Sequence, residues 1–389
     1  PWSRGGWGSG YTTGIGQQLR IWTQDNFGED LIYAPRGGTP FYWDATTGVS
    51  TRGITLEAAA NAASYSGQFV PNETYQIISS TVQRFCICFG ANPYDAGNPN
   101  TDFDPLLVRW SDQENPFQWV PAVTNQAGEQ RLSIGSQIVA AVNTRQEILV
   151  LTDAAIYSMQ YLGPPYVYGF QLLQDNISVM GPKSVITINN ITYWMGSDKF
   201  FMYSGRVETL PCSLRQFVFQ NLNKSQSYQV FAASNEQYSE VWWFYCSTNS
   251  NTVDSYVIYN YLDRVWYYGT MARTAWLDSG VLQYPLAADY NNRLLNHEDG
   301  NDDSSGPGAV AIDSYIQSSD FDIGDGHNFG FVWRILPDVT FAGSTSANPT
   351  CTMVVKPRTN SGTAYGAPNA NTVERTATYP VEQFTGQVY

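Results

Sequence analysis

The sequence predicts an all-β protein: a β-propeller of five to six blades followed by a smaller C-terminal β-domain. Of its 389 residues, 43% are hydrophobic, 15% are aromatic and only 14% are charged. Tyr, Trp, Phe, Thr and Val are typical of half-buried strands, and a disordered chain would carry more charge and fewer aromatics. The second observation is a repeat of strand-rich segments along the chain.

Each repeat contains an apolar or aromatic run between clusters of Gly, Pro, Asn and Asp. The first strands of the repeats are predicted to begin near Leu31, Phe85, Ile148, Thr192, Val241 and Arg293. The spacings between these positions are 54, 63, 44, 49 and 52 residues, which is close to the period of four-stranded propeller blades. The longest gap contains the polar loop at residues 94–105.

Changes of composition divide the chain into three regions. Residues 1–12 are predicted to form a glycine-rich arm, and residues 13–300 the propeller. Residues 301–389 are predicted to form a β-sandwich-like domain, because the polar segment NDDSSGPG separates the repeats from further strand signals. These signals lie at 312–324, 329–343 and 349–358. The chain ends in VEQFTGQVY, the pattern of a strand just begun, so we expect this domain to be incomplete.

Helix is expected at two places only. Residues 213–222 carry apolar side chains at helical spacing, with Ser213 as the N-cap, and residues 56–64 are a second candidate. The sequence has no run of 18 apolar residues, so we expect no stable membrane insertion.

The residues present no catalytic constellation, and we predict a protein that is not an enzyme and has no cofactor. Glycoside hydrolysis needs two facing carboxylates, and loop acids such as Asp112 and Glu114 have the pattern of solvated turns. Only His297 and His327 are present, so acid–base chemistry near neutral pH has few candidates.

One segment has a spacing that could suit a metal ion. Asp299, Asn301 and Asp303 stand at alternate positions and could offer oxygen ligands to calcium. An acidic linker is the alternative interpretation, because the final Glu of an EF-hand loop is missing. Cys86 and Cys88 share one face of a predicted strand, which favours free buried thiols.

Aromatic strands leave a similar choice between a binding and a packing role. Adjacent Trp242 and Trp243 could stack on sugars or bases. We favour packing, with the two rings on opposite faces of a blade that is buried on both sides.

Several long stretches resemble structural proteins of tailed bacteriophages. They include DPLLVRWSDQENPFQWVP, TRQEILVLTDAAIYSMQYLGPP, DNISVMGPKSV, YWMGSDKFFMYSGRVETLPC, YNYLDRVWYYGTMARTAW and SSDFDIGDGHNFGFVWRILPDVTF. The resemblance spans residues 10–389. It is to the family known as the tail nozzle, tail tubular protein B or packaged-DNA stabilisation protein of short-tailed phages.

The resemblance implies a structural virion protein, assembled in the host cytoplasm. Six copies would form a ring at the distal end of the tail, below the tail adaptor protein. Such a nozzle conducts viral DNA without binding it specifically, retains it before infection, releases it on infection and anchors fibres or spikes. The resemblance carries over no catalytic residue.

The formal net charge of −14 agrees with DNA as a cargo, because each basic group on a phosphate adds a salt-sensitive contact. Low charge and many aromatics also suit subunit interfaces. The interface candidates are Trp2, Trp7, Arg109, Trp110 and Trp276.

Two other functions remain open. A receptor- or glycan-binding tail module would expose several Trp rings in one groove. A hydrolase of cell-envelope polymers would hold two carboxylates about 5 to 9 Å apart in a pocket.

Overall fold

The computed structural model describes residues 20–95, 102–303, 306, 308–312, 314–318, 321, 324, 339–342, 344, 348–356 and 373–378. The chain divides into two compact units, Pro1–Asn301 and Asp302–Tyr389, and this division falls one residue from the expected boundary. The predicted N-terminal arm lies outside the described residues.

The first unit contains six antiparallel sheets in chain order. The first three sheets are β1 (Trp22–Phe27), β2 (Asp30–Pro35), β3 (Phe41–Trp43) and β4 (Ile54–Thr55); β5 (Thr74–Ser79), β6 (Cys86–Ala91), β7 (Asp104–Trp110) and β8 (Gly128–Arg131); and β9 (Ile138–Asn143), β10 (Ile148–Thr152), β11 (Ala155–Gly163) and β12 (Val167–Asp175). The next three sheets are β13 (Val185–Ile188), β14 (Ile191–Met195), β15 (Phe200–Tyr203) and β16 (Val207–Leu210); β17 (Phe231–Asn235), β18 (Glu240–Tyr245), β19 (Ser255–Asn260) and β20 (Val265–Thr270); and β21 (Ala275–Leu277), β22 (Leu286–Ala288) and β23 (Leu294–Asn296).

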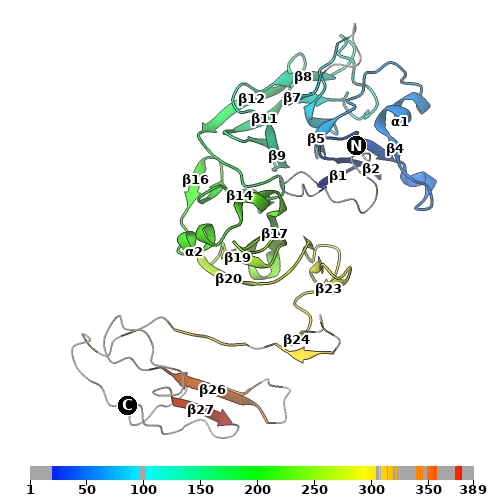
Figure 1. Ribbon diagram of the computed structural model, residues 1–389. Coiled ribbons are helices and arrows are strands. Elements are labelled where there is room, and N and C mark those ends of the chain that lie inside the picture. The colour runs from blue at the N-terminus through cyan, green and yellow to red at the C-terminus, as the bar shows by residue number, and fades with distance from the viewer. Residues whose placement is uncertain are drawn as a thin grey trace. The chain divides into compact units, whose positions relative to one another are not determined.

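These sheets are the six blades of a β-propeller, which confirms the predicted fold class. In Figure 1 the blades follow one another around a common centre, from β1 in blue to β23 in yellow. Each of the first five sheets is a meander whose strands pair in chain order. Tight turns make this possible: Phe27 pairs with Asp30, and Gly28 between them has a φ of 72° that side-chain-bearing residues rarely adopt.

The blades pack face to face, so alternate residues of one strand belong to different cores. Val150 of β10 lies in the core shared with the second blade. Its neighbours Leu149 and Leu151 lie in the core shared with the fourth blade. A strand packed on both faces is apolar at every position, and all five residues of β10 are buried.

The predicted starts of the first strands were wrong by one strand in most blades. Five of the predicted starts fall at the second strands of their sheets: Leu31, Phe85, Ile148, Thr192 and Val241 mark β2, β6, β10, β14 and β18. Arg293 precedes β23, the third strand of the sixth sheet. The second strands gave the signal because they are buried on both faces. Innermost strands such as β1 and β17 mix polar with apolar residues, so their place in the sheet was not visible in the sequence.

Side chains link the innermost strands of neighbouring blades. Gln76 of β5 pairs with both backbone groups of Ala141 on β9, donating from Nε2 at 2.6 Å and accepting at Oε1 at 2.8 Å. Asp25 of β1 accepts from the Ser79 N–H at 2.9 Å. These bonds satisfy the polar groups that the strand edges would otherwise leave unpaired.

The helices are short: α1 (Leu56–Ala62) and α2 (Arg215–Gln220) are α-helical, and η1 (Ala45–Thr47), η2 (Lys224–Gln229) and η3 (Glu236–Tyr238) are 3-10 turns. The Thr55 hydroxyl caps α1 by accepting from the Ala58 N–H at 3.2 Å. The predicted cap at Ser213 was wrong, because α2 begins after Leu214 and has no side-chain cap.

In the second unit, β24 (Asp302–Asp303) pairs with β25 (Val310–Ala311), and β26 (Thr350–Val355) pairs with β27 (Val373–Thr378). The third strand signal corresponds to β26. The predicted strand at 312–324 was wrong for residues 314–318, which form no strand. Most of the predicted strand at 329–343 lies outside the described residues. The sandwich-like arrangement stays a prediction.

Candidate functional site

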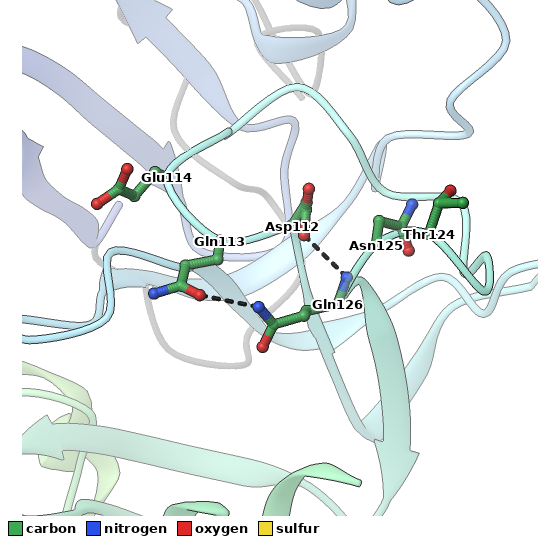
Figure 2. A pocket seen from close by; sticks show the side chains of 6 residues that line it. All are labelled: Asp112, Gln113, Glu114, Thr124, Asn125 and Gln126. Atoms are coloured by element: carbon green, nitrogen blue, oxygen red, sulfur yellow. Dashed lines mark hydrogen bonds between the residues drawn. The ribbon is translucent and has the colours of Figure 1, made fainter. Parts of the chain in front are cut away.

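The connection between β7 and β8 forms an open pocket of about 380 Å³ in the second blade. Its lining is entirely polar and consists of Asp112, Gln113, Glu114, Thr124, Asn125 and Gln126 (Figure 2). The pocket therefore contains the two loop carboxylates that the sequence offered to a hydrolase.

The geometry of this pocket does not match glycoside hydrolysis. The Asp112 carboxylate accepts from the Gln126 N–H at 2.8 Å, and the Gln126 amide donates to Gln113 Oε1 at 2.8 Å. Figure 2 shows the Glu114 carboxylate pointing away from Asp112. The two acids do not face one another across a substrate position, as that chemistry requires.

The rings needed for sugar stacking are also missing from this pocket. None of its six lining residues is aromatic, and among the Trp residues of the described part of the chain none is exposed. The glycan-binding alternative depended on clustered exposed Trp, so this burial counts against it. A second hollow of about 480 Å³, between the third and fourth blades, is likewise lined only by Asn143, Thr144, Arg145, Thr187, Asn189 and Asn190.

Exposed apolar side chains are concentrated near the end of the propeller. Within the described residues, nine of the 19 large hydrophobic side chains exposed in the first unit lie between Leu262 and Leu294. These 262–294 apolar residues are Leu262, Val265, Tyr267, Tyr268, Leu277, Val281, Leu282, Tyr290 and Leu294. Exposed apolar side chains that gather in one patch mark contacts with other macromolecules more often than scattered single residues do.

Two of the predicted interface residues were wrong, because both are buried inside the second blade. Arg109 is 2% exposed and Trp110 is 4% exposed. The Arg109 guanidinium donates to the Asn92 carbonyl at 2.9 Å and the Phe69 carbonyl at 3.1 Å. Burial lowers the pKa of Arg109, and the Glu129 carboxylate opposes this shift. Arg109 thus joins segments of one chain.

The other interface candidates stay predictions. Trp276 is half-buried between the last two blades, where its indole donates to the Ser234 carbonyl at 2.8 Å and its ring lies 5.3 Å from that of Trp242. Trp2 and Trp7 lie outside the described residues.

The packing prediction for the adjacent Trp pair is confirmed. Trp242 lies in the core that faces the sixth blade, and Trp243 lies in the core that faces the fourth. Cys86 and Cys88 are free and buried, as predicted. Burial raises the pKa of the Cys88 thiol to about 12, so this thiol stays protonated at neutral pH.

The predicted calcium segment spans the division between the two units of the chain. Within the part of the chain that the structure describes, no three side chains of the types His, Cys, Asp and Glu form a group that could hold a metal ion. Asp299 and Asn301 belong to the first unit and Asp303 to the second, and calcium binding there stays a prediction. His297 Nε2 accepts from Arg273 at 3.0 Å, and His327 lies outside the described residues.

One polar group was missed by reading the sequence. Asn235 and Glu240 lie opposite each other on β17 and β18, and Asn235 donates to Glu298 beyond β23 at 3.2 Å. Burial raises the pKa of Glu240, and the negative charge of Glu298 adds to this rise. No local pattern could have signalled the group, because Glu298 is distant in the chain.

No family model matches this chain, and no curated protein matches it. Similar solved structures include Hsv2 from Kluyveromyces marxianus, at 8% identity over 69% of this chain and 72% of that chain, with a TM-score of 0.39. BamB from Moraxella catarrhalis is 11% identical over 72% of this chain and 71% of that chain, with a TM-score of 0.38.

The SapL1 lectin, solved with alpha methyl fucoside, is 9% identical over 72% of this chain and 96% of that chain, with a TM-score of 0.36. At TM-scores this low, the three similarities carry no argument about what this chain binds or does. Among the helices that the structure describes, none is long and apolar enough to cross a membrane.

Proposed function

We propose that this chain is a structural subunit of a short-tailed phage tail, and that six copies form the nozzle ring around the DNA path. The resemblance to the nozzle family supports this function. Its stretches include β7, β10, β11, β15, β16 and β20, so they fall in four successive blades of the propeller.

The observation that carries the proposal is the concentration of the 262–294 apolar residues in the β19–β20 turn, on β20 and in the sixth blade. In a chain with only 14% charged residues, an apolar surface of this kind suits burial against a second copy. A closed ring uses two different faces of each subunit, and this surface would supply one of them.

The charge of the chain supports the role assigned to DNA. A formal net charge of −14 per subunit repels phosphate, so a duplex inside the ring would meet few salt-sensitive contacts. In this proposal the ring lies below the tail adaptor, holds the packaged DNA until infection, and carries fibres or spikes on its side.

The test is the assembly state of the purified chain, measured by electron cryo-microscopy and mass photometry. We expect a six-fold ring with an acidic channel at least as wide as a DNA duplex. Tyr267→Asp places a charge on a side chain that is 45% exposed in the 262–294 set, and it should shift the ring towards monomers. The matched control is Val123→Asp, at a fully exposed position outside this set, which should leave the ring intact.

Two results would overturn the proposal. One is a single copy of the chain per virion, and the other is a ring whose channel wall is basic. If Val123→Asp disrupts the ring as strongly as Tyr267→Asp, the interface does not lie at the 262–294 apolar residues.

A further inference from the structure

An oxygen-rich group of side chains lies where the fifth blade meets the sixth. Asn235 ends β17 and is the register partner of Glu240, which begins β18. Glu298 follows β23 of the sixth blade, and its Oε1 accepts from Asn235 Nδ2 at 3.2 Å. The group thus joins two blades whose strands can be followed in Figure 1.

One oxygen in this group has no partner. Asn235 is fully buried, with 0% of its surface exposed, and its Oδ1 accepts no hydrogen bond. Buried carbonyl oxygens are almost always paired, so an unpaired one calls for a bound ion or water. Because Asn235 and Glu240 stand opposite each other in the register, their side chains project from the same face of the sheet.

Two carboxylates that repel each other share this location. Glu240 accepts from the Trp242 indole at Oε2, 2.9 Å away, which leaves Oε1 for another partner. The negative charge of Glu298 acts on Glu240. Among the ion pairs of the described residues, none involves either acid.

Next to Glu298 in the chain, His297 forms a hydrogen bond with Arg273. Arg273, just before β21, donates from Nε to His297 Nε2 at 3.0 Å. At the start of η3, the Glu236 N–H donates to the Asp278 carboxylate at 3.0 Å. The cluster therefore combines acids and an unpaired amide oxygen, which are ligands that calcium prefers.

We propose that Asn235 Oδ1 and the carboxylates of Glu240 and Glu298 bind a calcium-class divalent cation that holds the sixth blade against the fifth. Water completes the coordination sphere, because such ions take about six to eight oxygens at flexible geometry. The site differs from the Asp299, Asn301 and Asp303 segment, since its ligands come from different blades. It goes beyond the proposed nozzle function and does not depend on it.

The position of Trp242 supplies the assay. Terbium replaces calcium at oxygen sites and emits light when an excited Trp lies close, and the Trp242 indole is bonded to Glu240. We expect saturable terbium emission from the full chain and its displacement by added calcium. Glu298→Gln should weaken terbium and calcium binding by about ten-fold or more.

Matched variants separate the site from general charge effects. Glu29→Gln removes the same charge from the exposed β1–β2 turn and should leave the affinity unchanged. Glu298 is exposed, so its replacement by Gln should leave the fold intact, as circular dichroism would verify. Calorimetry with calcium alone should show equal calcium affinities for the unaltered chain and Glu29→Gln, and a weaker affinity for Glu298→Gln.

Three results would overturn the proposal: no saturable terbium emission, emission that calcium does not displace, or equal affinities for Glu298→Gln and the unaltered chain. Assembly into a ring is measured independently, so failure of the cation site and failure of the nozzle function are distinguishable.

Discussion

Arg109 is the position where a single substitution should cost the propeller most. Its guanidinium donates to the carbonyls of Asn92 at 2.9 Å and Phe69 at 3.1 Å. It also pairs with Glu129 at 3.4 Å. Arg109→Met fills a similar volume but leaves these buried acceptors without their donor. Each buried acceptor left unpaired costs about 1–3 kcal/mol, so we expect a total loss of about 3–5 kcal/mol.

The assay is urea and thermal unfolding of the full chain, followed by Trp fluorescence. A loss of about 3–5 kcal/mol corresponds to a fall of about 6–10 °C in the melting temperature, at about 2 °C per kcal/mol for a large domain. Arg109→Lys keeps the charge but cannot bond several carbonyls at once, so its cost should lie between those of Arg109→Met and the unaltered chain.

Arg131 provides the matched control in the same sheet. It pairs with Asp104 at 2.6 Å, but its side chain is 58% exposed, so Arg131→Met should cost no more than about 1 kcal/mol. Equal melting temperatures for Arg109→Met and Arg131→Met would refute the assignment of Arg109 to the core.

Two further predictions concern titrating groups. Burial raises the pKa of Cys88 to about 12 and raises that of Cys86 as well, so neither thiol should react with a disulfide reagent at pH 8 before urea unfolds the protein; rapid labelling of either in the native protein would contradict this burial. Burial raises the pKa of Asp289, but hydrogen bonds from Arg293 and Asn291 lower it below the ordinary value overall. The Asp289 contribution is therefore present above about pH 4 and lost below it, and hydrogen exchange at the β22–β23 turn should show this loss in the unaltered chain but not in Asp289→Asn.

The strand signals show how far the sequence could lead. Runs such as Ile148–Thr152 were visible because a strand packed between two blades must be apolar at every position. The innermost strand Phe231–Asn235 is only partly buried and mixes polar with apolar residues. Its place in the sheet depends on pairing with β18, which no local pattern encodes.

Candidate sites were harder to predict than strands. Arg109 was predicted to lie at an interface because arginine is enriched there. Its environment is set by Phe69, Asn92 and Glu129, which approach from other segments of the chain. Burial of an arginine depends on whether distant carbonyls converge on it, and the residues next to it in the chain carry no information about that.

The sequence by itself determined the all-β class, the repeated blades, the acidic charge and the burial of Cys86 and Cys88. These follow from composition and from short periodicities, which act between residues that are near in the chain. Only the tertiary structure decided that Arg109 lies in the core and that Asn235, Glu240 and Glu298 meet. The reason is physical: burial and charge pairing depend on distances in space, and folding sets those distances between residues far apart in sequence.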